Sequence, residues 1–330
     1  MYKKIILIQA MLLSQIAFAA DNVAPTTPSN TPDPETQQLF NLGSKFVTAG
    51  VDGLKEQAIN SAESTINTNA VGISKSYLEK YFPTVELQLN LFDYNKTQSG
   101  LLILAPIWED DKNLVFTQDS VYHKDDRTTL NVGLGYRRLE LDKKLLLGVN
   151  TFYDYEFPYG NTRSSIGLEA RTTVGEVNFN QYWGISGWVS AANGIQERAL
   201  GGTDLEVGVP LPYMNWAKVY ARGFVWYGVE GARDLKGNDI SLRAQLPILP
   251  GFAVEAGHRT YTDSTPSENF LRLSYNVTDI FKTKRPEPWL SETAYNLSSM
   301  EDHKYDKVRR ENLIVKQGKK NGLTIKVGGY

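Results

Sequence analysis

Apolar and polar residues alternate one by one in two neighbouring stretches near the middle of the chain. Residues 130–136 place Leu, Val, Leu and Tyr at every second position, with Asn and Gly between them, and residues 147–155 repeat the pattern after a charged turn. A period of two is typical of a strand with one apolar face. The sequence predicts no helix or second sheet of matching hydrophobicity to cover that face, so lipid is its expected partner. A closed antiparallel barrel, apolar outside and polar inside, satisfies this pattern.

The alternation continues from about residue 84 to residue 276 and divides into twelve strand-like runs. An even number fits a bacterial barrel, because the chain then returns to the side of the membrane where it began. We therefore predict an all-β fold, a 12-stranded antiparallel transmembrane β-barrel over residues 83–281. The predicted strands begin near Thr84, Gln98, Asn113, Arg127, Lys144, Asn161, Glu176, Thr203, Ala217, Asn238, Phe252 and Glu268.

The connections between these runs differ in length. Every second connection is mostly tight, whereas two of the others, Ser190–Gly202 and Val229–Gly237, are long. Bacterial barrels have short periplasmic turns and longer outer loops, so we expect the tight connections in the periplasm. Trp108 and Trp216 then fall at the periplasmic rim and Tyr153 at the outer rim, where aromatic side chains gather at membrane interfaces.

The start of the chain has the pattern of an export signal. Lys3 and Lys4 precede the apolar run 5–13, and Ala17 and Ala19 are the small residues that a signal peptidase recognises. The apolar run is too short to span a bilayer. The predicted parts before the barrel are a signal peptide (1–19), a flexible leader rich in Pro, Thr and Asn (20–34), and a weakly amphipathic periplasmic helical segment (35–82).

Composition narrows the possible chemistry. The formal net charge of the 330 residues is −2, and the chain contains no cysteine. The charge predicts no nucleic-acid partner, and without cysteine neither a disulfide framework nor a thiolate metal site can form. No motif has the spacing of a metal or phosphate site, so we expect no cofactor.

The predicted inward face of the strands is polar and carries both signs of charge. Such a lumen can hold water or bind a polar plug. Gly133 and Gly135 share this face, and we expect their missing side chains to leave room for a plug. The lumen-facing candidates are Glu86, Asn131, Arg137, Asn150, Asp154, Glu169, Arg171, Glu206, Arg222, Arg243, Glu255, Arg259 and Arg272.

Beyond the last predicted strand the alternation stops, and a polar, partly helical stretch ends in the block Tyr305–Asn312 (YDKVRREN). With six blocks inside the barrel region, in the same order, this block resembles the β-domain of inverse autotransporters, the intimin and invasin family. The resemblance covers residues 84–315. The six blocks are Asn113–Gln118, Asp125–Asn131, Gly133–Arg137, Leu147–Tyr155, Gly184–Trp188 and Glu197–Ala199.

The resemblance implies an outer-membrane barrel whose following segment threads back through the lumen and delivers a C-terminal passenger to the cell surface. On this basis we expect residues 282–315 to be a lumen-threading linker and residues 316–330 a short surface tail. Cations of the linker should pair with inward carboxylates and its acids with inward arginines, since buried charges need partners. The threaded-segment candidates are Tyr305, Asp306, Arg309, Arg310 and Glu311.

The chain departs from the family pattern at both ends of the barrel. A weak helical segment stands where the family carries a peptidoglycan-binding LysM-like domain, and 15 residues follow Val315, too few for a folded passenger. The expected function is therefore that of an inverse-autotransporter-like translocator, related to cell-surface adhesion, without a fused passenger. An outer-membrane porin-like channel and an outer-membrane hydrolase are the alternatives.

The candidate for hydrolysis is His123 with Asp125 and Asp126, since paired acids and a histidine can activate water. Asp is equally typical of a turn, and these residues belong to or adjoin a block that the family resemblance already explains, so we expect no enzyme. The expected location is the cell outer membrane. The expected partners are outer-membrane lipid and lipopolysaccharide, periplasmic chaperones and the barrel assembly machinery, and surface ligands or peptidoglycan-associated partners.

Overall fold

The structure is a computed structural model that describes residues 34–38, 81–93, 96–263, 265–281, 288–320 and 323–328. The predicted signal peptide, nearly all of the leader and most of the helical segment lie outside the described residues, and so do residues 282–287 of the expected linker. Residues 34–38 form a short helix. No helix in the described part of the chain is long and apolar enough to cross a membrane.

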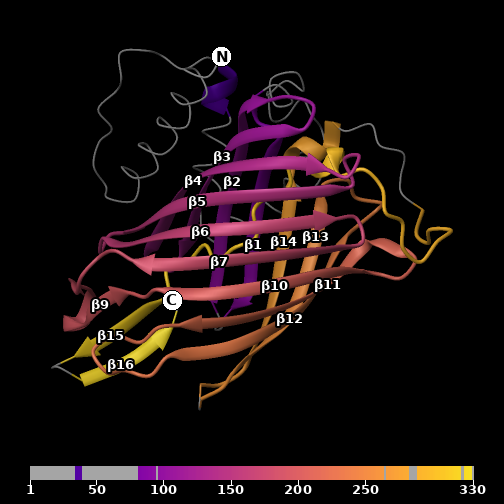
Figure 1. Cartoon of the computed structure of the whole chain (residues 1–330). Helices are drawn as coiled ribbons and strands as arrows, with labels where there is room; N and C mark the ends of the chain where they lie inside the picture. The colour runs from indigo at the N-terminus through magenta and orange to yellow at the C-terminus, as the bar shows by residue number, and fades with distance from the viewer. Residues whose placement is uncertain are drawn as a thin grey trace, which may run out of the picture.

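Twelve strands close into an antiparallel barrel, and this confirms the predicted fold class (Figure 1). The barrel closes where β1 pairs with β14, in register from Glu86 opposite Asn276 to Leu91 opposite Leu271. Every predicted strand start lies within three residues of an observed one. The barrel strands are β1 (Thr84–Asp93), β2 (Lys96–Glu109), β3 (Asn113–Lys124), β4 (Arg127–Glu140), β5 (Leu145–Phe157), β6 (Asn161–Thr172), β7 (Gly175–Gly184), β10 (Gly202–Leu211), β11 (Met214–Trp226), β12 (Leu235–Gln245), β13 (Phe252–Tyr261) and β14 (Glu268–Asn276).

The connections define two different ends of the barrel. We call the end with the tight connections, such as residues 110–112 and 141–144, the turn end, and the opposite end the loop end. At the first of these turns, Asp110 accepts hydrogen bonds from the backbone amides of Lys112 and Asn113, at 2.9 and 2.7 Å. The long connection 185–201 lies at the loop end. The short 3₁₀ helices η2 (Val277–Phe281) and η3 (Glu301–His303) follow the last barrel strand.

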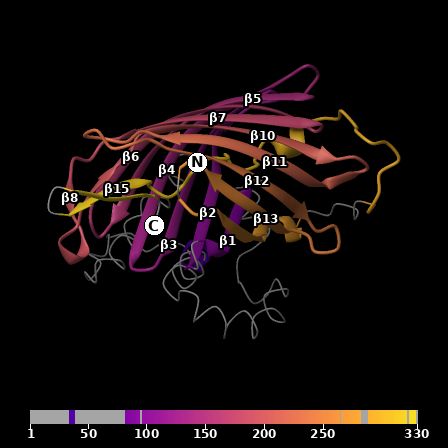
Figure 2. The ribbon, with the colours of Figure 1, turned by 90° about the horizontal axis from the view of Figure 1, so that it is seen from below.

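A second, four-stranded sheet lies at the loop end, at the left of Figure 1 and of Figure 2, which views the ribbon from below. The connection between β7 and β10 contributes β8 (Val189–Ser190), the 3₁₀ turn η1 (Ala192–Gly194) and β9 (Gln196–Ala199). The end of the chain contributes β15 (Lys316–Lys320) and β16 (Leu323–Gly328), and β15 pairs antiparallel with β9. The sequence predicted a long loop and an alternating tail here but not their pairing.

Apolar side chains point outward from the barrel, in the phase that the alternation predicts. Val132 on β4, Val149 on β5 and Leu168 on β6 are 39%, 42% and 53% exposed, whereas Asn131 and Asp154, of opposite phase, are buried. In water this outer surface would be unfavourable. An outward apolar band around a closed barrel is the surface that a bilayer covers.

Glycines on the inner wall make room for aromatic rings of neighbouring strands. Gly133 lies opposite Phe152, and Gly135 lies opposite Phe116. A Cβ atom added to either glycine would stand 2.2 Å from the facing ring. The space that the sequence analysis expected to hold a plug is therefore filled first by these rings, because cross-strand neighbours are the nearest groups to a missing side chain.

We predict that Val149→Arg destabilises the barrel by about 2–4 kcal/mol, since it places a charge on the lipid-facing side midway along β5. The matched control is Leu141→Arg, because Leu141 is 70% exposed in the β4–β5 turn; we expect its effect to stay within about 0.5 kcal/mol. The measurement is the unfolding free energy in urea of protein folded into lipid vesicles. Equal losses for both variants would contradict the lipid-facing position of β5.

Candidate functional site in the barrel lumen

The chain that follows the last barrel strand first runs along the turn end. We call residues 288–303 the rim segment. Its contacts explain its path, because it pairs with successive tight connections of the barrel. The bonds join the amide of Ser291 to the carbonyl of Tyr213 (2.8 Å), the amide of Tyr213 to the carbonyl of Ala294 (3.1 Å), the hydroxyl of Thr173 to the carbonyl of Asn296 (2.7 Å) and the amide of Met300 to the carbonyl of Lys143 (2.6 Å).

Residues 304–315, which we call the lumen segment, then pass inside the barrel from the turn end to the loop end. Only residues 301–303 just before it are helical, so most of the expected partly helical stretch has no regular secondary structure. Its side chains from 307 to 310 alternate between two sides of the lumen. At its far end the amide of Leu200, beside β9, donates to the carbonyl of Val315 at 2.9 Å. The lumen segment thus connects the rim segment to the four-stranded sheet.

No barrel strand forms a backbone ladder with the lumen segment; wall side chains satisfy its backbone groups instead. Buried backbone groups need such partners. The amides of Val308 and Glu311 donate to Gln118 (2.7 Å) and to the hydroxyl of Tyr182 (2.8 Å). Carbonyl acceptors and their donors are Lys304 with Arg137 (2.8 Å), Tyr305 with Thr84 (2.7 Å), Lys307 with Arg171 (3.1 Å), Arg309 with Asn180 (3.1 Å), Glu311 with Arg163 (2.7 Å) and Asn312 with Asn131 (3.0 Å).

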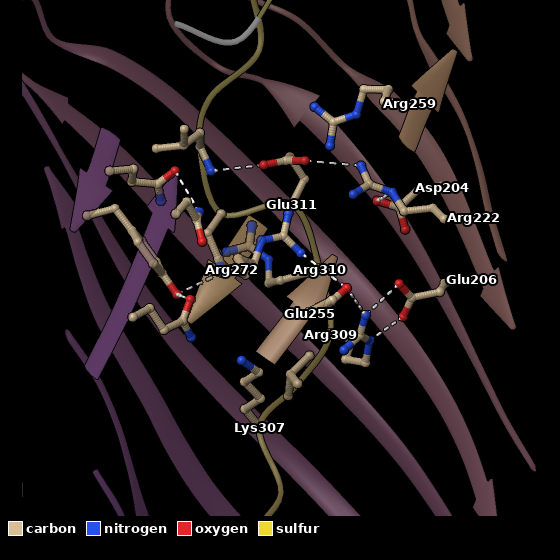
Figure 3. A pocket seen from close by; sticks show the side chains of 17 residues that line it. Asp204, Glu206, Arg222, Glu255, Arg259, Arg272, Lys307, Arg309, Arg310 and Glu311 are labelled. Atoms are coloured by element: carbon tan, nitrogen blue, oxygen red, sulfur yellow. Dashed lines mark hydrogen bonds and ion pairs between the residues drawn. The ribbon is translucent and has the colours of Figure 1, made fainter. Parts of the chain in front are cut away.

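Lys307 and Arg309, two residues apart in the lumen segment, reach the same side of the barrel wall. Lys307 pairs with Glu86 on β1 at 2.5 Å. Arg309 lies between two carboxylates, Glu206 on β10 at 2.5 Å and Glu255 on β13 at 3.3 Å (Figure 3). Both side chains therefore bind one continuous arc of the wall, which runs from β1 through β14 to β10.

Glu311 continues this row and reverses its sign. Its carboxylate pairs with Arg222 on β11 at 3.1 Å, as Figure 3 shows. Arg222 also lies within 3.7 Å of Asp204 and of Asp239, and Asp239 pairs with Arg259 at 2.8 Å. The row of the lumen segment is therefore positive, positive and negative, against a wall of opposite sign at each level.

The opposite face of the lumen segment carries a fully buried ionic cluster. Asp154 on β5 accepts hydrogen bonds from Arg163 on β6 at 2.8 Å and from Arg310 at 2.7 Å, and all three side chains are 0% exposed. One carboxylate thus serves two guanidinium groups. Buried charges of this kind require pairing of good geometry.

Apolar and aromatic contacts hold the same face. Val308 packs in a buried cluster with Leu104, Leu114, Phe116 and Phe152. The guanidinium of Arg310 lies 4.2 Å from the ring centre of Phe152, the ring that covers Gly133. Cation–π contacts strengthen when desolvated, so the glycine and aromatic pairs of the wall take part in binding the segment.

Across the lumen, the guanidinium of Arg309 lies 3.7 Å from the ring centre of Tyr220. Tyr220 in turn covers Gly208 on the neighbouring strand. The two central arginines of the lumen segment therefore each combine a carboxylate with an aromatic face. Planar guanidinium groups suit this double contact better than lysine would.

Two polar cavities lie in the lumen between described residues. One, of about 90 Å³, lies between the lumen segment and wall residues of β1–β3, β10, β11, β13 and β14, and one, of about 230 Å³, opens toward the turn end. Lys307 and Arg309 line both cavities. Buried atoms without a hydrogen-bond partner in the described residues, such as Nε of Arg222 and Oε1 of Glu176, border them, and polar cavities of this kind hold water.

At the loop end a second ionic cluster fixes the exit of the lumen segment. Lys316, which is 1% exposed, donates to Glu156 on β5. Arg127 bridges Glu156 at 2.7 Å and Glu197 on β9 at 2.8 Å. Barrel, β9 and β15 are thereby joined by one network, which the sequence analysis missed although Arg127 and Glu197 lie in its matching blocks.

A surface contact joins the same sheet to the neighbouring loop. The indole N–H of Trp188 donates to Glu230 at 2.6 Å, and Lys319 lies 3.8 Å from the centre of a Trp188 ring. Lys319 also pairs with Glu230 at 3.2 Å. The hydrogen bond from Trp188, followed by Lys319, lowers the pKa of the Glu230 carboxyl.

Several predicted lumen residues also form ion pairs with one another. Glu169 binds both Arg137 and Arg171, at 2.6 Å each. Arg243 and Arg272 lie 3.7 and 3.5 Å from Glu255. Asn150 lies opposite Gly167, and its Oδ1 has no hydrogen-bond partner in the described residues.

Two threaded-segment candidates bind groups at the rim, and for Asp306 this differs from the expected pairing with an inward arginine. Asp306 pairs with His303 at 2.8 Å, one turn earlier in the chain, rather than with a wall arginine. Tyr305 donates its hydroxyl to Glu109 at the turn end. Both residues lie where the segment enters the barrel, and rim groups are nearer there than the lumen wall. The sequence analysis did not name three neutral wall residues that bind the segment, Gln118, Asn180 and Tyr182, although it named Asn131 and Asn150.

The histidines lie apart from the lumen segment's central contacts. His123 contacts the hydroxyl of Thr128 through Nδ1 at 3.0 Å, beside the turn where Asp125 has a φ of 57°. His258 contacts Asn269 on the outer side at 2.7 Å. Within the described residues, no group of three His, Cys, Asp or Glu residues could hold a metal ion.

A family model described as "Inverse autotransporter, beta-domain" matches residues 37–312 of this chain. The chain belongs to this family. The matched range includes the whole barrel and all of the lumen segment except the segment's last three residues, 313–315. The family is of the adhesin and translocator type, and its barrel architecture places the protein in the outer membrane, in contact with lipid and lipopolysaccharide.

Individual relatives support the assignment. The chain is 27% identical over 311 residues to "Inverse autotransporter adhesin YeeJ" of Escherichia coli (strain K12), covering 90% of this chain and 13% of that protein. It is 28% identical over 319 residues to "Intimin" of Citrobacter freundii, covering 90% and 32%. "Invasin" of Yersinia enterocolitica is 30% identical over 183 residues, covering 54% and 21%. The chain thus spans less than half the length of each of these relatives.

A solved structure described as "Unveiling the Mechanism Behind the in-meso Crystallization of Membrane Proteins" has a similar fold. Its TM-score is 0.61 at 23% identity, and the match covers 72% of this chain and 100% of that chain. At this identity the likeness concerns the fold alone.

We predict that Asp154→Asn destabilises the folded barrel by about 3–5 kcal/mol, because it leaves Arg163 and Arg310 buried without their carboxylate. The control is Glu140→Gln, which breaks a surface pair with Arg138; the Arg138 side chain is 50% exposed and the Glu140 side chain 37%. Its expected effect is about 0–1 kcal/mol. Urea unfolding in vesicles measures both. A loss below that of the control would mean that the cluster does not hold the lumen segment.

Proposed function

We propose that the protein is an inverse-autotransporter translocator that carries the chain following its lumen segment across the outer membrane and anchors it there. The turn end would face the periplasm and the loop end the cell exterior, since short turns are periplasmic in bacterial barrels. The predicted signal peptide supports export to the periplasm, and a relative of matching sequence is named an adhesin. Display of adhesive chain at the surface is the corresponding role.

The observation that carries this proposal is how the lumen segment is held. Its backbone bonds to side chains such as Gln118 and Arg163 rather than to a strand. A strand inserted in the barrel would be fixed by a complete ladder of hydrogen bonds. A chain held by side chains can instead pass through the lumen stepwise and stop there, as a translocator requires.

The same contacts favour a translocator over an open porin. Lys307 and Arg309 reach across the lumen to Glu86, Glu206 and Glu255, and the remaining cavities lie on either side of this crossing. The hydrolase alternative finds less support, because His123 contacts a threonine on the outer side of the barrel. We infer that the protein acts without catalysis.

The partners of this function would act at successive stages. Periplasmic chaperones and the barrel assembly machinery would receive the exported chain and insert the barrel. Surface ligands would bind at the loop end, where β8, β9, β15 and β16 form their sheet. Peptidoglycan-associated partners would meet the part of the chain before β1.

We predict that an epitope placed after Tyr330 is labelled by antibody on intact cells, because the lumen segment leads the chain from the turn end to the loop end. An epitope inserted at Asn193–Gly194, in the exposed loop between β8 and β9, is the positive control for the outer side. One inserted at Leu141 is the negative control. Labelling of the first epitope only after permeabilisation, alongside the Leu141 epitope, would overturn the proposal.

We further predict that the intact protein conducts ions poorly in planar bilayers and that deletion of residues 304–330 raises its conductance several-fold. The physical reason is that a lumen stripped of its central segment becomes a water-filled channel. Heat-modifiable migration in detergent gels verifies that the shortened barrel is folded. High conductance of the intact protein would favour the porin alternative.

A further inference from the structure

Three charged residues of the lumen segment form an ordered row with a spacing of two. Lys307 faces Glu86, Arg309 faces Glu206 and Glu255, and Glu311 faces Arg222. An extended chain presents every second residue to the same side, so the row meets one wall at three successive levels. From the turn end to the loop end, the wall is negative, negative and positive. The order of charges is therefore position-specific and not merely balanced.

A shift of two residues toward the loop end would destroy this match. Arg309 would then take the position of Glu311 and face Arg222, with Arg259 in the same cavity wall. Tyr305 would take the position of Lys307, and Glu86 would lose its cation. Like charges brought together in a desolvated space are unfavourable.

A shift of two residues toward the turn end is equally unfavourable. Glu311 would then face Glu206 and Glu255, two carboxylates that now bind Arg309. Leu313 would take the position of Glu311 and leave Arg222 without this partner. Both directions of slippage by two residues are thus opposed by charge.

A shift of one residue is opposed by a different contact. It would exchange the two faces of the segment, because alternate residues of an extended chain point to opposite sides. Arg309 would then enter the apolar cluster of Leu104 and Phe116, where Val308 now packs. Only the observed register satisfies both faces.

We propose that Lys307, Arg309 and Glu311 fix the register at which the translocated chain stops in the lumen. The proposal rests on the proposed translocator function and adds a role for these three residues as positioning residues. The segment would pass the barrel until its positive, positive and negative row meets the wall groups of opposite sign. The five consecutive residues Lys307–Glu311 would then determine the final position of the exported chain.

The absence of cysteine from the sequence makes the register measurable. The backbone amide of Val308 lies 2.7 Å from Oε1 of Gln118, so the pair Gln118→Cys and Val308→Cys reports the observed register with a short thiol-specific cross-linker. The pair Gln118→Cys and Asp306→Cys reports a shift of two residues, about 7 Å, toward the loop end. The ratio of the two cross-linking yields, measured in the full chain on assembled barrels, is the readout.

We predict that the native charges favour the 118–308 cross-link over the 118–306 cross-link by more than about tenfold. In the shifted register like charges would meet, and the free-energy cost of that contact exceeds the difference that a tenfold ratio represents. Arg309→Glu should lower the ratio, since a shift of two residues toward the loop end brings Glu at 309 to Arg222 and Lys307 to Glu206, while the pair of Arg310 with Asp154 still favours the native register. Adding Glu206→Arg should restore the native ratio. Arg138→Glu, a reversal of equal size on the exposed face of β4 beside Glu140, is the control and should leave the ratio unchanged.

Two further variants keep the test decisive. If Arg309→Glu prevents barrel assembly, Arg309→Gln removes the crossing without adding repulsion and should populate both cross-links. Deletion of residues 318–330 removes β16 and half of the pairing of β15 with β9 but keeps Lys316, and it should leave the native ratio in place, because the three charges and the pair of Lys316 with Glu156 remain. Loss of the native ratio in this deletion, or a native ratio in an assembled Arg309→Glu or Arg309→Gln barrel, would overturn the proposal.

The outcome is separable from that of the translocator proposal. An epitope after Tyr330 that is labelled on intact cells, with a cross-link ratio that does not respond to charge, would retain translocation and reject the register role. A ratio that responds to charge, with an epitope labelled only after permeabilisation, would reject surface delivery instead.

Discussion

The structure depends on one constraint, which is that charged groups removed from water must find partners. The barrel encloses many such groups, and its wall pairs some of them internally, as Glu169 does with Arg137 and Arg171. Others are completed by the lumen segment. Asp154 binds a wall arginine and a segment arginine at once, and Glu206 binds Arg309. The segment is therefore a structural part of the wall's electrostatics and, in the proposed function, also a chain in transit, and the two roles require different kinds of contact.

The lumen segment meets both requirements because its backbone and its side chains bind by different means. A backbone ladder would have been uniform along the chain and indifferent to sequence. Bonds to side chains such as Asn180 and Arg163 hold the backbone only where those residues stand. The side chains then decide position, with Val308 in an apolar cluster and Arg310 in an ionic one. Rings such as Phe152, seated over glycine, give the wall the flat surfaces on which guanidinium groups stack.

Much of the fold can be predicted from the sequence, because the alternation of apolar and polar residues is a local property of each strand. Alternation between residues 130 and 155 fixes which face of each strand is apolar, and the confirmed number of strands follows from counting such runs. The alternation does not determine the height of each residue along the barrel axis. The sequence therefore indicated that the segment's cations would meet acids, but not that Lys307 would meet Glu86 or Arg310 would meet Asp154. Those pairs depend on strand tilt and register, which accumulate over many strands.

The pairing of β9 with β15 could not be predicted from the sequence. Glu197 and Gly318 are partners in that ladder although more than a hundred residues separate them. Each strand alone is short, and neither has a strong pattern. Their partnership is imposed by the lumen segment, which fixes where β15 can begin, and by Lys316 and Arg127, which tie both strands to Glu156. The surface sheet is thus a consequence of the buried charges below it, because the register in the lumen determines which residues emerge at the loop end.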